Sequence, residues 1–596
     1  MLRRASLFCA LCLVLALGVR MAASFSGPQQ KPPLPQFRSG VTLVPIDVRV
    51  VDGKGKPITG LTQEDFTVLE NDVPQPIRQF AALDFASEKP QPAAHVVMRE
   101  AALTLTPQTA RVFLIVLGRG KLQEPSKGMD AILHFVREQL LPQDQVAVFA
   151  YDRATDFTTN HEEIAKILER FKRMHQEIDF EIGLQVTSGL AAIYGSKAIP
   201  RKLQSQIDLL FEGSPLVASH PVTPRIPASA TDDARRQAET LQRQQTEKVH
   251  ADMDADAGLP HATLWNEQDV IESSQFTDLT FDEFIEANAQ TLQDLGNCYA
   301  GIEYLRHIEG EKHLVFVTEK GMFLPRTDDD EALARAANDA RVALDTIQTG
   351  GIYIPQAGGA PVNSWSETFA FQALHNVSDW TGGVSSVMKS GQAAVDQLND
   401  ATRTGYVLGY YPTNATFDGT YRKINVKVRA PGATVLYRHG YYARLELLPF
   451  DRRGFITQDR ILAALAFGRT VNDIKLKLDA SLARSETGEG RDLVLSVRID
   501  PSRLSFRTTA DGSHLGLIDI AVFCFDQKEH DQKAQMLHNS WQKAELKFTE
   551  AVFQTIKRDG IPYQARIPVP AAVRNIRVIV YDYKADLVGS VDGKVI

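Results

Sequence analysis

Two continuous apolar runs flank a helical repeat at the start of the central region. Residues 111–117 (RVFLIVL) and 145–151 (QVAVFAY) are apolar without alternation, which is typical of strands buried on both faces of a parallel sheet. Between them, apolar residues recur at helical spacing, at Met129, Ile132, Leu133, Val136 and Leu140. Pro142 and Asp144 end this helix. The pattern therefore predicts a βαβ unit.

The same order of elements returns later in the chain. Residues 312–318 (KHLVFVT) form another apolar run, and residues 351–355 are expected to form a further strand. Between these runs we expect a helix that carries Leu333, Ala336, Ala337, Ala340, Ala343 and Ile347. Alternating β and α elements predict an α/β domain over residues 108–403, built on a doubly wound parallel sheet.

A polar insertion interrupts this α/β domain over about residues 213–260. Residues 213–230 are rich in Pro and Ser, and residues 232–256 (DDARRQAETLQRQQTEKVHADMDAD) have too few apolar positions to pack on the sheet. The second stretch is expected to be either a solvated helix or a disordered excursion, and an exposed helix is favoured.

Patterns of β structure flank the α/β domain on both sides. Residues 25–100 comprise a Pro-rich linker and a small β unit, which is too short to bury a core alone and should pack on the next part of the chain. Residues 404–445 predict two or three antiparallel strands joined by tight turns. Residues 446–596 predict a short amphipathic helix over residues 451–469 and then strands at the spacing of a C-terminal β-sandwich domain.

Residues 1–24 have the composition of a secretory signal peptide. Arg3 and Arg4 precede an apolar segment over residues 7–19, and residues 22–24 (AAS) supply a cleavage site. The alternative is a signal anchor, but the apolar segment is shorter than the ~20 residues that span a bilayer. No later apolar run is long enough either. We expect a secreted or periplasmic protein with no stable membrane insertion after signal cleavage.

Composition and charge narrow the class of protein. The 596 residues are 44% hydrophobic and 23% charged, an ordinary globular composition that suits roughly three or four domains at about 150 residues each. Lys and Arg total 65 against 73 Asp and Glu, so the formal net charge is −8, and cleavage would make it −11 by removing three arginines. No basic stripe could neutralise a row of phosphates, so nucleic acid is not an expected partner.

Cys298 and Cys524 would remain after signal cleavage. They lie in different contexts, a helical stretch and the strand-like segment 521–525 (AVFCF). A disulfide is compatible with an oxidising compartment, but the sequence cannot place the two sulfurs together. Two buried, unpaired thiols are the favoured state.

Seven segments cover most of residues 37–443: FRSGVTLVPIDVRVVDGKGKPITGLTQEDFTVLENDVPQPIRQF, RVFLIVLGRG, LLPQDQVAVFAYD, GEKHLVFVTEKGMFLP, ARAANDARVALDTI, DWTGG and RTGYVLGYYPTNATFDGTYRKINVKVRAPGATVLYRHGYYA. In this order they resemble bacterial exported proteins with a von Willebrand factor type A-related domain, especially those of acidobacteria. The first and last segments are the most specific. The resemblance implies a type A-like fold for residues 108–403 and a role in protein interaction or adhesion.

The resemblance also identifies the positions of a metal site. In type A domains with a metal-ion-dependent adhesion site, the first strand ends in Asp-x-Ser-x-Ser, whose oxygens bind Mg²⁺. The matching residues here are Gly118, Gly120 and Leu122, which have no side-chain oxygen. The family's later Asp matches Glu319, and Lys320 beside it is a competing cation. One carboxylate cannot hold Mg²⁺ against water, so we expect a degenerate site with neither metal nor other cofactor.

Residues around these positions are candidate ligand contacts. Arg119, Lys121, Asp152 and Lys320 are expected near the carboxyl ends of the parallel strands, where a protein or cell-envelope ligand would bind. A metal-dependent adhesin that retains a non-standard metal site, with ligands such as Asp152 or Thr158, is an alternative.

Residues 118–120 (GRG) also match the start of a dinucleotide-binding fingerprint, with Asp152 where a ribose-binding acid would lie. Gln123 replaces the third glycine, and an exported protein would rarely meet NAD. A turn that needs glycine is the favoured explanation.

The sequence contains no complete catalytic set. Residues 161–165 (HEEIA) begin like a zincin helix, but Ala165 replaces the second His, so the first turn of a helix is the simpler interpretation. Residues 328–331 (DDDE) are expected to begin a helix rather than bind Ca²⁺. No Gly-x-Ser-x-Gly elbow occurs, and Cys298 has no local activating base. We expect a non-enzymatic interaction protein; the competing class is an exported hydrolase with an unrecognised active site.

Overall fold

The computed structural model describes residues 43–86, 110–151, 153–186, 201–211, 216–217, 272–274, 281–319, 321–322, 324, 329–350, 364–387, 389–444, 453–467, 469–485, 491–509, 511–527, 534–585 and 587–595. The expected signal peptide and Pro-rich linker, most of the polar insertion, and Asp152, Lys320 and Asp328 lie outside these residues. The described residues form a mixed α/β structure with several sheets and nine α-helices. None of these helices is long and apolar enough to cross a membrane.

The largest sheet has seven strands in the order β12-β11-β10-β5-β6-β7-β8. They are β5 (Arg111–Leu117), β6 (Gln145–Ala150), β7 (Arg153–Thr155), β8 (Leu216–Val217), β10 (Glu311–Thr318), β11 (Val342–Gln348) and β12 (Ser385–Ser386). The strands from β12 to β6 are parallel, but β7 is antiparallel to both neighbours. The sheet is therefore mixed rather than wholly parallel, because the chain reverses at Tyr151, whose φ is 51°.

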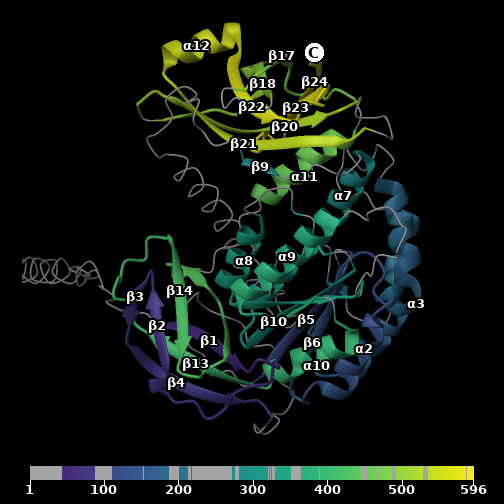
Figure 1. The fold of residues 1–596 in the computed structure, drawn as a ribbon, viewed down its shortest axis with the longest axis vertical. Helices are drawn as coiled ribbons and strands as arrows, with labels where there is room; N and C mark the ends of the chain where they lie inside the picture. Colours follow the sequence, from purple (N-terminus) through teal and green to yellow (C-terminus); the bar gives the residue numbers. More distant parts are fainter. Residues whose placement is uncertain are drawn as a thin grey trace, which may run out of the picture. The chain divides into compact units, whose positions relative to one another are not determined.

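Helices cover both faces of this sheet (Figure 1). Alternate residues of β5 enter two apolar cores, with Phe113 and Ile115 in the first and Leu114 and Val116 in the second. The first core includes residues of α2 (Gly128–His134), the π-helical turn η2 (Phe135–Gln139), α3 (His161–Val186), α5 (Arg201–Leu210) and α10 (Gly391–Thr402). The second includes residues of α7 (Phe281–Arg306), α8 (Asp329–Ala340) and α9 (Ser364–Thr381). Burial on both faces explains why β5 is apolar throughout.

The helix expected to extend to Ile347 ends earlier. α8 stops at Ala340, Arg341 has a φ of 56°, and β11 begins at Val342 and pairs with β10. Ala343 and Ile347 fit the helical spacing of α8, but both are buried residues of β11. The expected strand at residues 351–355 lies outside the described residues.

Strands from both sides of the α/β domain form one unit, which we call the β module (Figure 1). It contains β1 (Val44–Val51), the short helix η1 (Gln63–Asp65), β2 (Phe66–Glu70), β3 (Val73–Gln75), β4 (Ile77–Asp84), β13 (Thr404–Tyr410), β14 (Tyr421–Val428), β15 (Thr434–Tyr437) and β16 (Gly440–Tyr442). Its two sheets, β15-β1-β13-β4 and β16-β14-β2-β3, share one apolar core. The hydroxyl of Tyr406 donates to the carbonyl of Ile58, 348 residues earlier in the chain. The early β unit thus completes its core with much later strands.

The last part of the chain forms two further sheets. One contains β17 (Leu476–Arg484), β18 (Arg491–Ile499) and β22 (Ile561–Val569), and the other contains β9 (Glu272–Ser274), β19 (Arg507–Thr508), β20 (His514–Phe525), β21 (Met536–Phe548), β23 (Asn575–Asp582) and β24 (Leu587–Lys594). The short helix η3 (Pro501–Arg503) follows β18. One core joins residues of both sheets and of α12 (Glu550–Asp559), and α11 (Arg453–Ala466) packs in a separate core with β20, β21 and β23. Cys524 and Cys298 are buried and unpaired, as predicted.

Candidate functional site

The predicted degenerate positions lie in the connection between β5 and α2. We call residues 118–121, at the carboxyl end of β5, the β5 loop. Leu122 comes next, is 3% exposed and belongs to the apolar core under α2. Lys121 is exposed, whereas Arg119 is buried. Of the expected ligand contacts that the structure describes, Lys121 alone is presented to solvent.

Three successive backbone N–H groups of the β5 loop donate to carboxylates from three different elements. The hydrogen bonds run from Arg119 to Asp294 Oδ1 (3.0 Å), from Gly120 to Asp179 Oδ2 (3.0 Å) and from Lys121 to Glu319 Oε2 (2.7 Å). Asp294 belongs to α7, Asp179 belongs to α3, and Glu319 directly follows β10. Successive backbone N–H groups can bind an anion, and such a set is called a nest. We use this name for the three N–H groups of the β5 loop, each of which has one of the protein's own carboxylates as its partner.

The buried side chain of Arg119 links the β5 loop to Asp179 of α3. Its Nε donates to Asp179 Oδ1 at 2.8 Å, and its Nη2 donates to the Asp179 carbonyl at 3.4 Å. Arg119 is only 7% exposed. The guanidinium therefore supplies a fixed positive charge within the loop and is not displayed on the surface.

Gly118 and Gly120 lie where neighbouring atoms leave no room for a side chain. A Cβ on Gly118 would lie 2.9 Å from the carbonyl oxygen of Val317 and 3.2 Å from Asp294 Oδ2. A Cβ on Gly120 would lie 2.5 Å from Glu319 Oε2, and Gly120 has a φ of 97°, which L-residues rarely adopt. The turn geometry expected for residues 118–120 is confirmed.

The β5 loop is anchored to β11 and α2. Thr349 Oγ1 donates to the Lys121 carbonyl at 2.9 Å, and the N–H groups of Gly128 and Met129 bond to the carbonyls just after the loop. Gln348 Nε2 donates to the Glu319 carbonyl at 2.8 Å. These bonds fix the backbone of both the loop and Glu319 in place.

Asp294 is the most perturbed acid at this site. Burial raises its pKa to about 8, although the N–H and guanidinium of Arg119 act in the opposite direction. Its Oδ2 is buried and has no hydrogen-bond partner among the described residues. Burial, with a further contribution from Asp294, raises the pKa of Cys298 far above its ordinary value. This thiol is therefore neutral, and nothing in its surroundings activates it as a nucleophile.

A buried Tyr151–His175 pair lies beside the same loop. The Tyr151 hydroxyl is 2.7 Å from Nδ1 of His175. Burial lowers the pKa of His175, and the carbonyls of Gly118 and Gly120 act in the opposite direction. A neutral imidazole thus faces the backbone carbonyls on the underside of the β5 loop.

Asp179, His175 and Asp294 were not predicted from the sequence. For Asp294 a signal exists, because it is a turn before Cys298 and in line with Ile302 and Leu305 on the apolar face of a helix. An acid on such a face is expected to have a specific partner. Nothing in the sequence around Asp179 distinguishes it from its neighbours.

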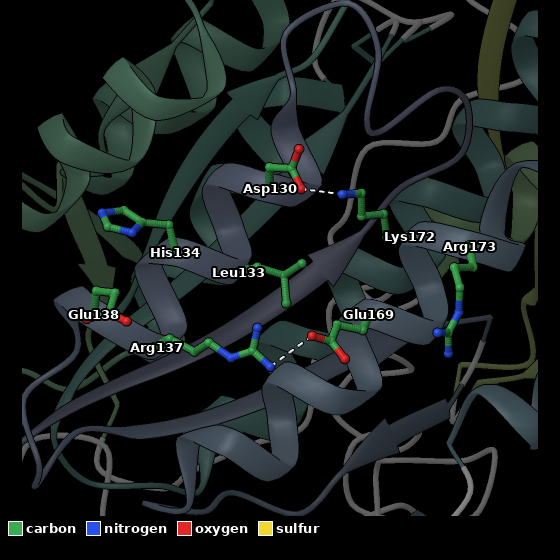
Figure 2. Close-up of a pocket in the computed structure, with 8 residues that line it drawn as sticks. All are labelled: Asp130, Leu133, His134, Arg137, Glu138, Glu169, Lys172 and Arg173. Atoms are coloured by element: carbon green, nitrogen blue, oxygen red, sulfur yellow. Dashed lines mark hydrogen bonds and ion pairs between the residues drawn. The ribbon is translucent and has the colours of Figure 1, made fainter.

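A pocket of about 620 Å³ lies between α2 and α3 (Figure 2). It is lined by Asp130, Leu133, His134, Arg137, Glu138, Glu169, Lys172 and Arg173. Arg137 is paired with Glu162. Figure 2 shows its second pair, with Glu169, and the pair between Lys172 and Asp130. These pairs largely neutralise the pocket, and none of the predicted site residues lines it.

Two other sequence patterns are ordinary helix starts. His161 is the first residue of α3, and its Nε2 lies 2.9 Å from the Asp144 carbonyl. Asp329, Asp330 and Glu331 lie in the first turn of α8, as expected for acids that complement the helix dipole.

The β5 loop does not fit a divalent cation. It presents N–H donors and a guanidinium, whereas Mg²⁺ requires oxygen ligands. Across the described ranges, no group of three or more His, Cys, Asp and Glu could hold a metal ion. Comparisons with protein-family models, with curated proteins and with solved structures found no match, so the resemblance to type A-related proteins stands on the quoted segments alone.

Proposed function

We propose that this chain is an exported, non-enzymatic interaction protein that binds a protein or cell-envelope ligand without a metal ion. In this proposal, residues 108–403 are a degenerate type A-like domain and residues 446–596 are a β-sandwich. Helices on both faces of the seven-stranded sheet support the first assignment. A core shared by two sheets supports the second.

The observation that carries the proposal is the filled nest of the β5 loop. Its three N–H groups and the Arg119 guanidinium already have carboxylate partners, so the loop keeps its conformation with no cation present. Exposed Lys121 lies at the rim of this closed structure. A rigid loop with a solvent-facing cation at the carboxyl edge of a sheet suits recognition of a partner.

The competing hydrolase needs a reactive group that a substrate can reach. Cys298 is fully buried and its raised pKa keeps it protonated, so it does not favour that class. Hydrolysis of esters, peptides or glycans by the purified protein, lost on a single substitution, would contradict our proposal.

Affinity capture tests the proposal directly. The purified chain would be used as bait for the source organism's cell-envelope proteins, in EDTA and in excess Mg²⁺, beside Lys121→Glu and Lys423→Glu variants. Lys423 is an exposed residue of β14 in the β module and serves as the matched control. We expect the same retained partner in both buffers, lost with Lys121→Glu and kept with Lys423→Glu. Retention only with Mg²⁺ would instead favour a metal-dependent adhesin.

A further inference from the structure

We infer that the β5 loop is a carboxylate-binding site, which Glu319 occupies as an internal ligand and from which an acidic side chain of a protein partner displaces it. This inference rests on the proposed function for the existence of a partner. It adds the chemistry of recognition, a backbone N–H and a lysine cation.

The three carboxylates in the nest are not equivalent. Asp294 is fully buried, and Asp179 is held by the guanidinium of Arg119 as well as by Gly120. Glu319 is partly exposed, and among the described residues its carboxylate has one hydrogen-bond partner, the Lys121 N–H at the surface. Glu319 is therefore the ligand that can leave while the other two hold the loop in place.

The donor that Glu319 would vacate is preorganised. Thr349 fixes the Lys121 carbonyl, and Gln348 fixes the Glu319 carbonyl, so only the Glu319 side chain has to move. The absent side chain of Gly120 leaves room for a carboxylate directly above the backbone, 2.5 Å from where a Cβ would lie. A donor that needs no rearrangement binds an external group at the lowest cost in entropy.

One unused polar atom lies beneath this loop. Asp294 Oδ2 is buried, lies 3.2 Å from where a Cβ on Gly118 would be, and lacks a hydrogen-bond partner among the described residues. Native proteins rarely leave such atoms unsatisfied, and those that remain need an explanation, such as a functional role. The β5 loop therefore packs on a buried carboxyl oxygen whose hydrogen bonding is incomplete in the closed state.

Charge identifies the class of the incoming group. The Arg119 guanidinium is paired with Asp179, and the raised pKa of Asp294 keeps that acid protonated at neutral pH. The Glu319 carboxylate accepts from the backbone N–H of Lys121, whose side chain is exposed. If Glu319 swings away, the loop loses one negative charge and the Lys121 N–H loses its acceptor. A single carboxylate restores both the charge and the acceptor, whereas a neutral amide restores the acceptor alone.

The test uses an acidic tripeptide, acetyl-Gly-Glu-Gly-amide, and its Gln counterpart as probes of the full chain. The protein is labelled with ¹⁵N-lysine, and the Lys121 amide signal is assigned by its loss in Lys121→Arg. Glu319→Gln removes the internal anion and keeps the shape of the side chain. Glu64→Gln, at an exposed residue of η1 in the β module, is the matched control.

We expect the acidic peptide to shift the Lys121 signal of Glu319→Gln at a concentration at least tenfold below that needed for the natural chain. Glu64→Gln should behave as the natural chain, and the Gln peptide should have no effect. Equal responses of Glu319→Gln and the natural chain, or no response of either, would overturn the inference. Peptide binding without a captured envelope partner would count against the proposed function alone, and capture without peptide binding would count against the inference alone.

Discussion

Glu319 lies directly over Gly120, where a Cβ on the glycine would be 2.5 Å from Oε2 and 2.9 Å from Cβ of the glutamate. Gly120 has no side-chain oxygen that could bind a metal ion. Because it has no side chain at all, it also leaves room for the Glu319 carboxylate. The missing oxygen ligand at position 120 and the place of Glu319 over the loop are two consequences of the same glycine.

Restoring the oxygen-bearing residues should therefore harm the protein rather than restore a metal site. Gly118→Asp would clash with Val317 and Asp294, and Gly120→Ser with Glu319. Overpacking of this kind costs about 1–3 kcal/mol, and the φ of 97° at Gly120 adds backbone strain. Urea unfolding of each variant would measure the loss of stability, which Mg²⁺ should not recover.

Comparison with Gly419→Ser separates the two destabilising effects of Gly120→Ser, the clash with Glu319 and the backbone strain. Gly419 has a φ of 79°, but nothing lies within 4 Å of its would-be Cβ, so this variant bears the backbone strain alone. Gly120→Ser should be the more destabilised of the two. Equal losses would show that Glu319 does not crowd position 120.

Mg²⁺ should leave the melting temperature of the natural chain unchanged. The three carboxylates that the structure places at the expected position, those of Asp294, Asp179 and Glu319, already accept from backbone N–H groups of the β5 loop. A working site would be obvious, because a ligand at 1,000 times its Kd stabilises the native state by about 4 kcal/mol. Melting curves in EDTA, Mg²⁺ and Mn²⁺ make the comparison. An upward shift that disappears in Glu319→Ala would return metal-dependent adhesion to first place.

Glu70 should be critical for the β module. Its buried carboxylate accepts from the hydroxyls of Tyr410 (2.6 Å) and Tyr441 (2.8 Å) and from Arg422 Nη1 (3.3 Å), all from the later strands. Glu70→Ala would leave the buried Arg422 without its carboxylate, at a cost of about 3–5 kcal/mol. Chemical unfolding would measure this loss. Glu64→Ala, at an exposed residue, should change stability by less than about 0.5 kcal/mol, and a similar result for Glu70→Ala would contradict the finding.

Local pattern predicted the elements of the central sheet that are buried on both faces. β5, β6 and β10 have continuous apolar sequences because helices cover them on both sides. The boundary between α8 and β11 was missed because Ala343 and Ile347 repeat at the helical spacing of α8. The positive φ of Arg341, which ends the helix, has no signal in residue type.

The sequence pattern did not predict which distant strands pair with one another. Tyr410 and Glu70 are 340 residues apart, and alternating strands of this kind show which face is apolar but not which strand lies alongside. The same limit applies to the candidate site. The three carboxylates of the nest come from separate elements, and only the tertiary structure brings Asp179, Asp294 and Glu319 to one loop.

The buried carboxyl of Asp294 should make stability depend on pH. Its pKa is about 8 in the folded chain against 3.8 for an unperturbed group, so between these values the folded state keeps a proton that the unfolded state has released. Stability should therefore fall as pH rises through this window, by up to about 1.4 kcal/mol per pH unit. Asp294→Asn cannot titrate and still accepts from the Arg119 N–H, so it should lack this decline.

Unfolding in urea from pH 5 to pH 8 compares the two proteins, with Asp418→Asn as the control. Hydrogen bonds from Thr420 lower the pKa of Asp418, so its contribution has the opposite sign: it is present above the unfolded pKa and is lost only as pH falls through the lower folded value. The stability of Asp418→Asn should therefore change with pH in the same way as that of the natural chain between pH 5 and pH 8. Asp294→Asn should instead become progressively more stable than the natural chain as pH rises, because only in the natural chain does unfolding release a proton that the folded state keeps. Parallel curves for Asp294→Asn would mean that this carboxyl is already ionised beside Arg119, and the charge balance assigned to the β5 loop would then be wrong.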